Sequence, residues 1–162
     1  MPHPPVIDGL EFARTGSKLE GTWPVAGFAR LRDSLYAGVG AIRYAIEGIA
    51  REQGYPALRV MIGGELQLVC QRCLGALGFP LSIAVFLELA VTQAEVDAVP
   101  VEPDGPERIV AGREMRVHDL IEDELLLALP IAPRHESCQG KAAGAAREMQ
   151  SPFAGLRGIL KH

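Results

Sequence analysis

The 162-residue chain has few cysteines and no long apolar run. No run approaches the roughly 18 apolar residues that a membrane-spanning helix requires, and the opening Met1–Pro5 lacks the basic and apolar regions of a secretory signal. Three cysteines are an odd number and too few for a disulfide scaffold, so we expect reduced thiols or metal ligands. These absences predict a soluble, cytoplasmic protein, and 48% hydrophobic residues suffice for the core of one domain.

Motifs of common enzyme classes are also missing. The chain has no Gly-x-Ser-x-Gly nucleophile turn, no phosphate-binding loop and no His-Glu-x-x-His metal helix. A redox role for Cys70 and Cys73 is disfavoured, because a strand and not a helix N-terminus follows them. A metal-dependent nuclease would use clustered acids, but their helical spacing favours a solvated helix face. These acids are Asp119, Glu122, Asp123 and Glu124. The sequence therefore predicts a protein that is not an enzyme.

Alternating apolar residues predict a β-hairpin whose tip carries Cys70 and Cys73. Apolar side chains recur at every second position from Leu77 to Leu89, which is the period of a strand. Further strands are predicted over 42–47, 58–62 and 65–70, with Gly63–Gly64 as a two-residue turn. Together they form a four-stranded antiparallel β-meander, with Ile83 and Val85 on its buried face.

The predicted helices lie at both ends of the chain and near residues 118–129. The segment 118–129 has acids in its first turns and Pro130 as its stop, and its leucines should cover the sheet. A short N-terminal helix is expected over 28–36 and a short C-terminal helix over 151–160. Residues 1–16 are expected to be an extended lead-in that joins the sheet near 6–12. The fold class is therefore α+β.

We expect one α+β domain over residues 1–133 and a flexible basic C-terminal region over 134–162 that includes the short terminal helix. Within the domain, residues 95–114 read as an acidic surface loop because they combine acids with Pro100, Pro103, Gly105 and Pro106. A short strand is possible near 107–111. No chemistry is assigned to this loop.

Charge is spread unevenly around the net value of −4. Residues 95–124 hold ten acids and three arginines, whereas five basic residues and two acids follow from Arg134 onward. The second region, together with Arg72 at the hairpin tip, is a candidate surface for RNA or a partner; the alternative is a solvated surface of uneven charge. The candidate binding residues are Arg72, Arg134, Lys141, Arg147, Arg157 and Lys161.

Four residues from two distant segments form a candidate metal site. Cys70, Cys73, His135 and Cys138 supply three sulfurs and one imidazole, a ligand set that suits a closed tetrahedral zinc site. Such a site requires the loop after Pro133 to lie over the hairpin tip. In the alternative interpretation Cys70 is a small buried hydrophobe, and Cys73 and Cys138 are exposed and inert.

Three stretches carry a resemblance to a known family. They are Leu68-Val69-Cys70-Gln71-Arg72-Cys73, the run from Asp119 to His135 that contains Glu122-Asp123-Glu124 and ends Leu129-Pro130-Ile131-Ala132-Pro133-Arg134-His135, and Ser151-Pro152-Phe153-Ala154-Gly155-Leu156. From about Leu19 to its C-terminus the chain resembles the YceD family of bacteria and plastids. Family members vary in the number and position of cysteines after the helix, and this chain has only Cys138 there.

This resemblance implies a cytoplasmic role in the synthesis, processing or stability of large-subunit ribosomal RNA. The expected partners are ribosomal RNA or a ribosome-associated protein, and no catalytic residue can be carried over. A non-catalytic ribosome-biogenesis factor is the favoured interpretation. The alternatives are a metal-dependent nuclease or redox enzyme in the same pathway, or a zinc-stabilised protein-only adaptor that uses the acidic loop and the helix.

Overall fold

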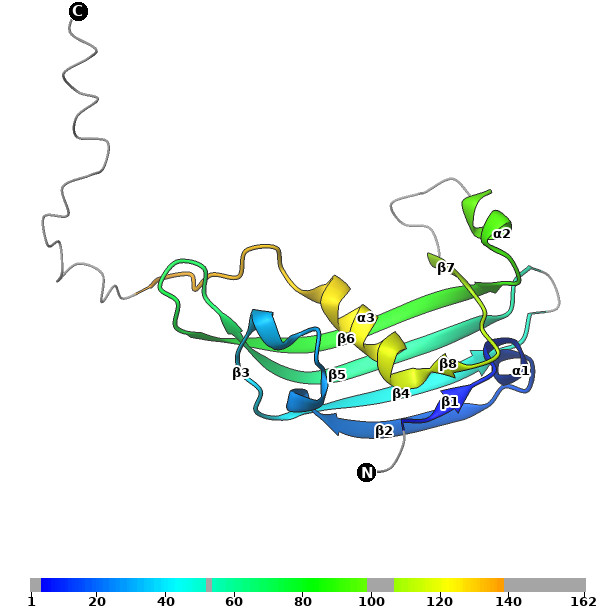
Figure 1. Ribbon diagram of the computed structural model, residues 1–162, viewed down its shortest axis with the longest axis horizontal. Coiled ribbons are helices and arrows are strands. Elements are labelled where there is room, and N and C mark those ends of the chain that lie inside the picture. The colour runs from blue at the N-terminus through cyan, green and yellow to red at the C-terminus, as the bar shows by residue number, and fades with distance from the viewer. Residues whose placement is uncertain (1–3, 52–53, 99–106, 139–162) are drawn as a thin grey trace, which may run out of the picture.

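The structure is a computed structural model that describes residues 4–51, 54–98 and 107–138 (Figure 1). Its elements in chain order are β1 (Val6–Ile7), α1 (Gly9–Arg14), β2 (Lys18–Pro24), the 3-10 turns η1 (Val25–Gly27) and η2 (Arg32–Ser34), β3 (Leu35–Ala37), β4 (Ala41–Ile49), β5 (Ala57–Val69), β6 (Ala76–Ala90), α2 (Gln93–Asp97), β7 (Glu107–Val110), β8 (Met115–Arg116) and α3 (Val117–Ala128). The prediction of a mixed α+β fold with a mostly antiparallel sheet is confirmed. Of the helices in these ranges, none has the length and apolar character to span a bilayer.

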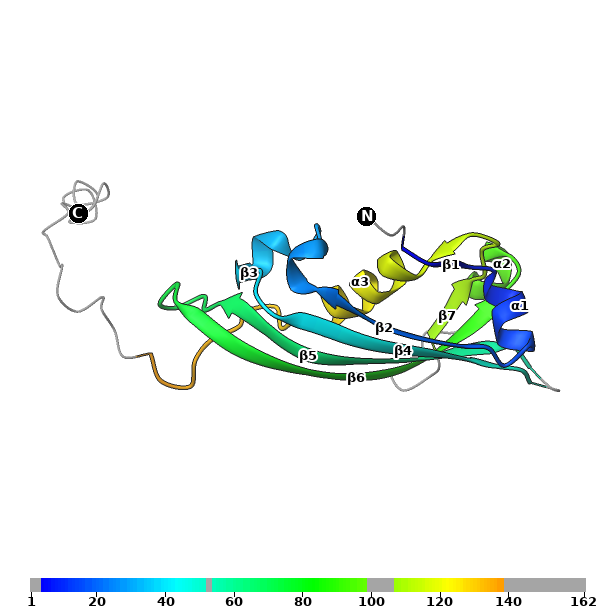
Figure 2. The ribbon, with the colours of Figure 1, turned by 90° about the horizontal axis from the view of Figure 1, so that it is seen from below.

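The main sheet has six strands in the order β2-β4-β5-β6-β7, with β3 also paired to β5. All pairs are antiparallel except β6 with β7. The longest pair is the β5–β6 hairpin, whose register runs from Ala57 opposite Glu88 to Val69 opposite Ala76. Figure 2 shows this sheet from its edge, with α3 and the two 3-10 turns on the same side.

The core lies between the sheet and the elements on that side. Alternate residues of β4, β5 and β6 point into it because side chains on a strand alternate between two faces. Val117, Ile121 and Leu125 of α3 recur at helical spacing and are fully buried against the same cluster. Burying each such side chain contributes about 1.5–3 kcal/mol. Ile83 and Val85 contact this core but are half-buried, whereas Leu87 and Leu89 of the same strand are buried.

The predicted turn at Gly63–Gly64 is wrong. β5 continues through both glycines, and Gly64 pairs with Leu81. Gly64 does not have positive φ, so it does not turn the chain. A Cβ atom on Gly64 would lie 2.9 Å from the Ala41 carbonyl oxygen and 2.9 Å from Ile42 Cδ1. Glycine therefore allows close approach of a neighbouring backbone at this position.

The predicted N-terminal helix over 28–36 is also wrong. The 3-10 turn η1 ends before this segment, η2 covers only Arg32–Ser34, and β3 begins at Leu35. Phe28 and Leu31, which lie between the two 3-10 turns, are buried. Leu35 then leaves the helical spacing because it pairs with Leu68 of β5. Pairing with a long strand satisfies backbone groups that the end of a short helix would leave without partners.

The lead-in before residue 16 does not join the main sheet. Val6 and Ile7 pair with Arg116 and Met115 in a separate two-stranded sheet. The helix α1 follows, and the Asp8 side chain caps it by accepting a hydrogen bond from the Glu11 N–H at 3.0 Å. Residues 9–12, which were expected to be extended, are therefore helical.

The expected acidic loop contains regular structure at both ends. α2 begins before it, and the short strand predicted near 107–111 is present as β7, which runs parallel to β6. The predicted C-terminal helix over 151–160 lies outside the described residues, as do the last four candidate basic residues, Lys141, Arg147, Arg157 and Lys161.

The predicted helix near 118–129 is present as α3, but two of its acids are not on a solvated face. Glu122 is 4% exposed and Glu124 is 5% exposed. Glu124 follows Val117 by seven residues, which places both on the inner side of the helix. Glu122 accepts hydrogen bonds from the Arg30 backbone N–H at 2.7 Å and from Arg30 Nε at 2.9 Å. The segment between β2 and β4 therefore covers Glu122.

Candidate metal centre and basic surface

The turn between β5 and β6 brings two cysteines to the end of the sheet. The Cys70 N–H donates to the Gly75 carbonyl at 2.9 Å, and the Leu74 N–H donates to the Cys70 carbonyl at 2.8 Å. Leu74 has φ of 58°, a left-handed conformation that is uncommon for leucine. These contacts fold six residues into a compact turn, with Cys70 buried and Cys73 exposed.

The segment after α3 crosses to this turn. The Gln71 N–H donates to the Pro133 carbonyl at 2.8 Å, which joins the two segments through their backbones. His135 Nε2 lies 2.9 Å from the Ala76 carbonyl oxygen. Because a carbonyl oxygen only accepts, Nε2 carries the proton and donates it. The lone pair is then on Nδ1, which is the tautomer that a metal-binding histidine requires.

The side chains of Cys70, Cys73, His135 and Cys138 converge, and their ligand atoms all lie within 4.8 Å of one another. The Sγ atoms of Cys70 and Cys138 are 3.7 Å apart, and Nδ1 of His135 lies 3.5 Å from Cys73 Sγ and 3.8 Å from Cys138 Sγ. A zinc ion bound tetrahedrally at about 2.3 Å from sulfur and about 2.0–2.1 Å from nitrogen separates its ligands by roughly 3.5–3.8 Å. The arrangement can therefore hold a metal ion.

The donor atoms define which metals fit. Thiolate and imidazole favour zinc and other soft or borderline ions, whereas magnesium and calcium require oxygen ligands. The hydrogen bond from His135 Nε2 to the Ala76 carbonyl fixes the ring in the way that outer hydrogen bonds fix metal ligands. With four protein ligands the site would be closed, and a closed site has a structural role because no position remains for substrate.

The pKa values of the Cys70 and Cys138 thiols are shifted in opposite directions. Burial by itself raises the pKa of the Cys70 thiol, but hydrogen bonds from the backbone N–H groups of Cys73, His135 and Arg72 outweigh it and lower this pKa to about 5. Burial raises the pKa of the Cys138 thiol, and its sulfur contacts with Cys70 and Cys73 raise it further. The surroundings of Cys70 therefore favour its thiolate, and a bound cation would also favour loss of the proton from Cys138.

Arg72 and Arg134 lie at this same end of the molecule. Each directly follows one member of the backbone contact between Gln71 and Pro133, and both side chains are exposed. The structure thus brings together two of the six candidate binding residues. Glu136 is also exposed in this segment and reduces its positive charge.

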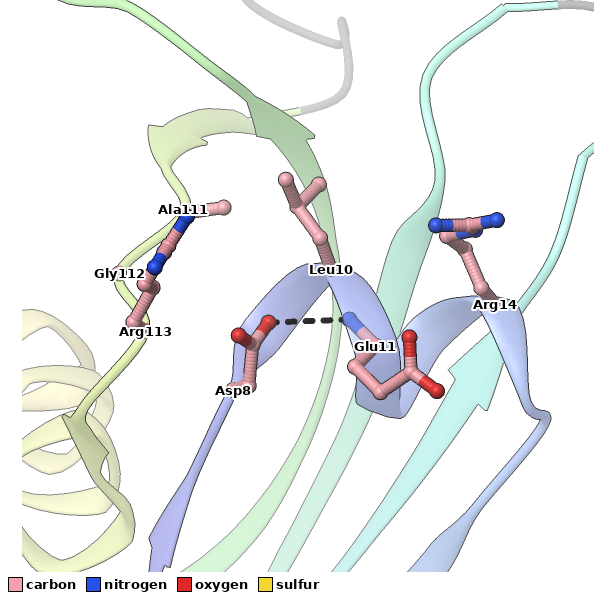
Figure 3. Close-up of a pocket in the computed structure, with 7 residues that line it drawn as sticks. All are labelled: Asp8, Leu10, Glu11, Arg14, Ala111, Gly112 and Arg113. Carbon is pink, nitrogen blue, oxygen red and sulfur yellow. Dashed lines mark hydrogen bonds between the residues drawn. The ribbon is translucent and has the colours of Figure 1, made fainter.

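Another depression lies between α1 and the connection from β7 to β8 and has a volume of about 220 Å³ (Figure 3). It is lined by Asp8, Leu10, Glu11, Arg14, Ala111, Gly112 and Arg113. Its four charged residues are all exposed, and Asp8 is engaged as the cap of α1. Its lining contains neither a thiol nor a hydroxyl beside a base, so it gives no arrangement for nucleophilic catalysis.

The structure also reveals interacting charges that the sequence reasoning did not assign. Arg30 binds Glu122 and forms an ion pair with Asp123 at 2.6 Å, so two acids considered for a nuclease are already neutralised. The sequence gave no indication of this partner, since 92 residues separate Arg30 from Glu122. Glu124 could have been identified from its spacing of seven residues after Val117, which places it among the buried positions of α3.

Comparison with protein-family models gives one match. The model described as "Large ribosomal RNA subunit accumulation protein YceD" matches residues 58–160, which is more than half of the chain. The matched region includes the β5–β6 hairpin, α3 and all four residues of the metal cluster. Searches of curated proteins and of solved structures give no match.

Proposed function

The chain belongs to the YceD family, and from this we propose that it is a non-catalytic ribosome-biogenesis factor that promotes accumulation of large-subunit (23S) ribosomal RNA. It does so in the cytoplasm, by binding RNA or a ribonucleoprotein partner during synthesis or processing of the RNA. The observation that best supports a binding surface at this end is the hydrogen bond from the Gln71 N–H to the Pro133 carbonyl at 2.8 Å. This hydrogen bond places Arg72 and Arg134 at the same end of the sheet, where both can contact one partner.

Zinc holds this surface in our proposal. Backbone and side-chain hydrogen bonds join the hairpin tip to the segment 133–138, and a metal bound by Cys70, Cys73, His135 and Cys138 would fix their relative positions. The spacing of the ligand atoms and the protonation of His135 on Nε2 support this assignment. Zinc would supply structural cross-linking and no chemistry on RNA.

Phosphate binding is the role of the basic residues. Arg72 and Arg134 each contact a phosphate, and Lys141, Arg147, Arg157 and Lys161, which follow the metal cluster in the chain, add further cations. A surface of so few cations binds weakly and depends steeply on salt, because each neutralised phosphate releases counterions. A partner protein on the ribosomal precursor therefore contributes to specificity.

Catalysis is not part of this proposal. A nuclease needs several carboxylates that converge on a metal ion, but Arg30 engages Glu122 and Asp123, and the one group of potential metal ligands found among the described residues is the cluster of Cys70. A redox enzyme needs an accessible dithiol, but the more reactive thiol, Cys70, is buried beside Cys138. These engagements favour a binding protein over both alternatives.

Crosslinking in growing cells tests the binding surface. RNA crosslinked to the wild-type protein is sequenced and compared with RNA recovered with Arg72→Glu/Arg134→Glu. We expect large-subunit ribosomal RNA with the wild type and at least a fivefold loss with the double variant. The matched control is Arg14→Glu/Arg113→Glu, which makes the same change in charge on two exposed arginines beside α1. Equal loss in both variants, or no loss in either, would contradict the proposed surface.

A further inference from the structure

A second pocket, of about 290 Å³, lies where α3 meets β7 and β8. Five charged side chains and four apolar ones line it: Glu107, Asp119, Asp123, Glu124, Arg116, Ile109, Met115, Leu120 and Leu127. Four of the charged groups are carboxylates, and only one is a cation. The pocket is therefore acidic around an apolar lining.

The carboxylates differ in whether they already have a partner. Asp123 forms an ion pair with Arg30 at 2.6 Å, and Asp119 lies 3.7 Å from Nδ1 of His118. Glu124 is 5% exposed, and no hydrogen bond or ion pair joins its side chain to another described residue. Among those residues no fully buried side-chain oxygen lacks a partner, so the Glu124 oxygens are the part of the side chain that is open to the pocket. A largely buried carboxylate with no cation beside it is costly to ionise, so its position at this pocket points to a ligand that supplies the cation.

The surroundings of Glu124 reinforce this cost. Burial, together with the nearby charges of Glu107 and Asp123, raises the pKa of Glu124 to about 7. A proton therefore occupies this carboxyl part of the time at neutral pH. The ligand that replaces the proton must be cationic, because phosphate or another anion would meet the same carboxylates and be repelled.

Apolar side chains specify the rest of the ligand. Leu127 lies three residues after Glu124 and is 68% exposed, although it lines the pocket. Together with Ile109 and Met115 it offers a surface for methylene groups beside the carboxylate. Lysine and arginine combine an aliphatic stem with a cationic end, and they bury the stem while the charged end finds a partner.

We infer that this pocket binds a lysine or arginine side chain of a basic protein segment, with its cationic end on Glu124 and Glu107 and its stem against Leu127. The inference goes beyond the RNA surface proposed above, because α3, β7 and β8 supply the site and neither Arg72 nor Arg134 lines it. The partner is a basic protein and not RNA. Binding strengthens as pH rises through about 7, because Glu124 then loses its proton.

Other charges near Glu124 set the background for that pH dependence. Arg116 lines the pocket from β8, and Arg30 neutralises Asp123 from the segment after η1. Glu107 faces Glu124 from β7, and Asp119 lies five residues before Glu124 on α3. With Asp123 paired and one cation present, the pocket retains negative charge for an incoming cation.

Fluorescence anisotropy with a labelled eight-residue peptide of alternating lysine and glycine tests this site. We expect Glu124→Gln to weaken peptide binding by about tenfold or more, since a charge-assisted hydrogen bond is lost. Glu114→Gln is the matched control, because Glu114 is an exposed acid near the pocket that does not line it. A single-stranded RNA oligonucleotide serves as the second probe, and its binding should be the same for both variants.

A second variant, which should be more stable than the wild type, shows whether loss of peptide binding can occur without loss of folding. Leu127→Lys places an ammonium group three residues after Glu124, where it can form an ion pair within the helix. We expect this variant to melt at a higher temperature than the wild type and to lose peptide binding. Unchanged peptide affinity in Glu124→Gln, or equal weakening in Glu114→Gln, would overturn the inference. Loss of RNA binding in Arg72→Glu/Arg134→Glu with retained peptide binding would leave it intact.

Discussion

The two ends of the β5–β6 hairpin are closed by different chemistry. At the tip, three thiols and an imidazole converge, and their ligand atoms lie within 4.8 Å of one another. At the open end, Glu88 is 6% exposed and lies between two arginines, with Arg108 Nη2 at 2.8 Å and Arg51 Nη1 at 3.0 Å. One end is therefore closed by ion pairs within the polypeptide, whereas the other presents four ligands that could hold a metal ion.

The arginines at the open end are also held by aromatic rings. The Arg108 guanidinium lies 3.9 Å from the centre of the Tyr55 ring, and that of Arg51 lies 4.8 Å from the Phe86 ring. Such contacts contribute about 0.5–2 kcal/mol each. Because side chains of the chain itself hold the open end, the metal that we propose at the tip would control the basic surface without controlling the fold of the sheet.

The largest expected effect comes from a change that disrupts both ends together. Leu87 is 1% exposed in the middle of the core, so Leu87→Asp buries an unpaired charge and should cost more than about 4 kcal/mol, enough to prevent folding. Val85→Asp, on the same face but half-buried, should also unfold the protein. Ala84→Asp, on the opposite, exposed face of β6, is the control and should melt cooperatively. A cooperative melt of Leu87→Asp, followed by circular dichroism, would show that this face is not the core.

Removal of the metal should affect the tip alone. Elemental analysis of protein purified without a histidine tag should find about one zinc per chain. Chelation should lower the melting temperature by about 10 °C, because a metal whose Kd lies well below its free concentration stabilises the folded protein by several kcal/mol. Hydrogen exchange should then increase at residues 70–75 and 133–138 and stay unchanged at the open end. If the purified protein contains no metal and its melting temperature does not change in chelator, the cysteines are packing residues and not metal ligands.

Removal of the shared carboxylate at the open end should destabilise that end and leave the metal site unchanged. Glu88→Ala leaves Arg108 and Arg51 without their shared partner and should destabilise the protein by about 3 kcal/mol, measured by denaturant unfolding. Its zinc content should equal that of the wild type. A variant that also loses zinc would show that the two ends are coupled through the sheet, in conflict with the separation described above.

The smallest effects are expected along α3, where two buried carboxyls titrate in opposite senses. Burial raises the pKa of Glu122, but the hydrogen bonds from Arg30 outweigh it and lower this pKa, whereas burial raises the pKa of Glu124 to about 7. Glu122→Gln should therefore destabilise the protein by about 2 kcal/mol at pH 7, and the loss should shrink as pH falls through the lowered pKa. Glu124→Gln should gain stability relative to the wild type as pH rises from about 4.5 through 7. Parallel pH profiles for the two variants would contradict these environments.

The sequence predicted those parts of the molecule that depend on local pattern. Alternation from Leu77 to Leu89 predicted the long strand, and the spacing of two cysteines with His135 and Cys138 predicted the ligand set that the structure brings together. The Gly63–Gly64 pair led to a wrong prediction because glycine occurs both in tight turns and where two backbones pack closely. Only the position of the neighbouring strand distinguishes these two roles. The Asp8 cap of α1 could have been found from the acid three residues later, Glu11.

Features that depend on distant residues could not be predicted in this way. Arg30 neutralises Glu122 across 92 residues, and β7 joins β6 in parallel, which no local pattern encodes. The same limit applies to the acidic pocket, because its lining comes from β7, β8 and α3. Helical spacing identifies α3 and would also place Glu124 among its buried positions, but it does not reveal that Glu122 is buried, since the segment that covers Glu122 is remote in sequence.

The central claim is that the metal-held end of the sheet, through Arg72 and Arg134, supports accumulation of large-subunit ribosomal RNA. The most direct measurement is the ratio of large- to small-subunit ribosomal RNA in cells that carry Arg72→Glu/Arg134→Glu or the control Arg14→Glu/Arg113→Glu as the only copy. The account predicts a lower ratio for the first variant alone, with both proteins present at wild-type levels and melting temperatures, because exposed charges contribute little to folding. A normal ratio for Arg72→Glu/Arg134→Glu, together with a reduced ratio for Glu124→Gln, would contradict it and would make the acidic pocket the working surface.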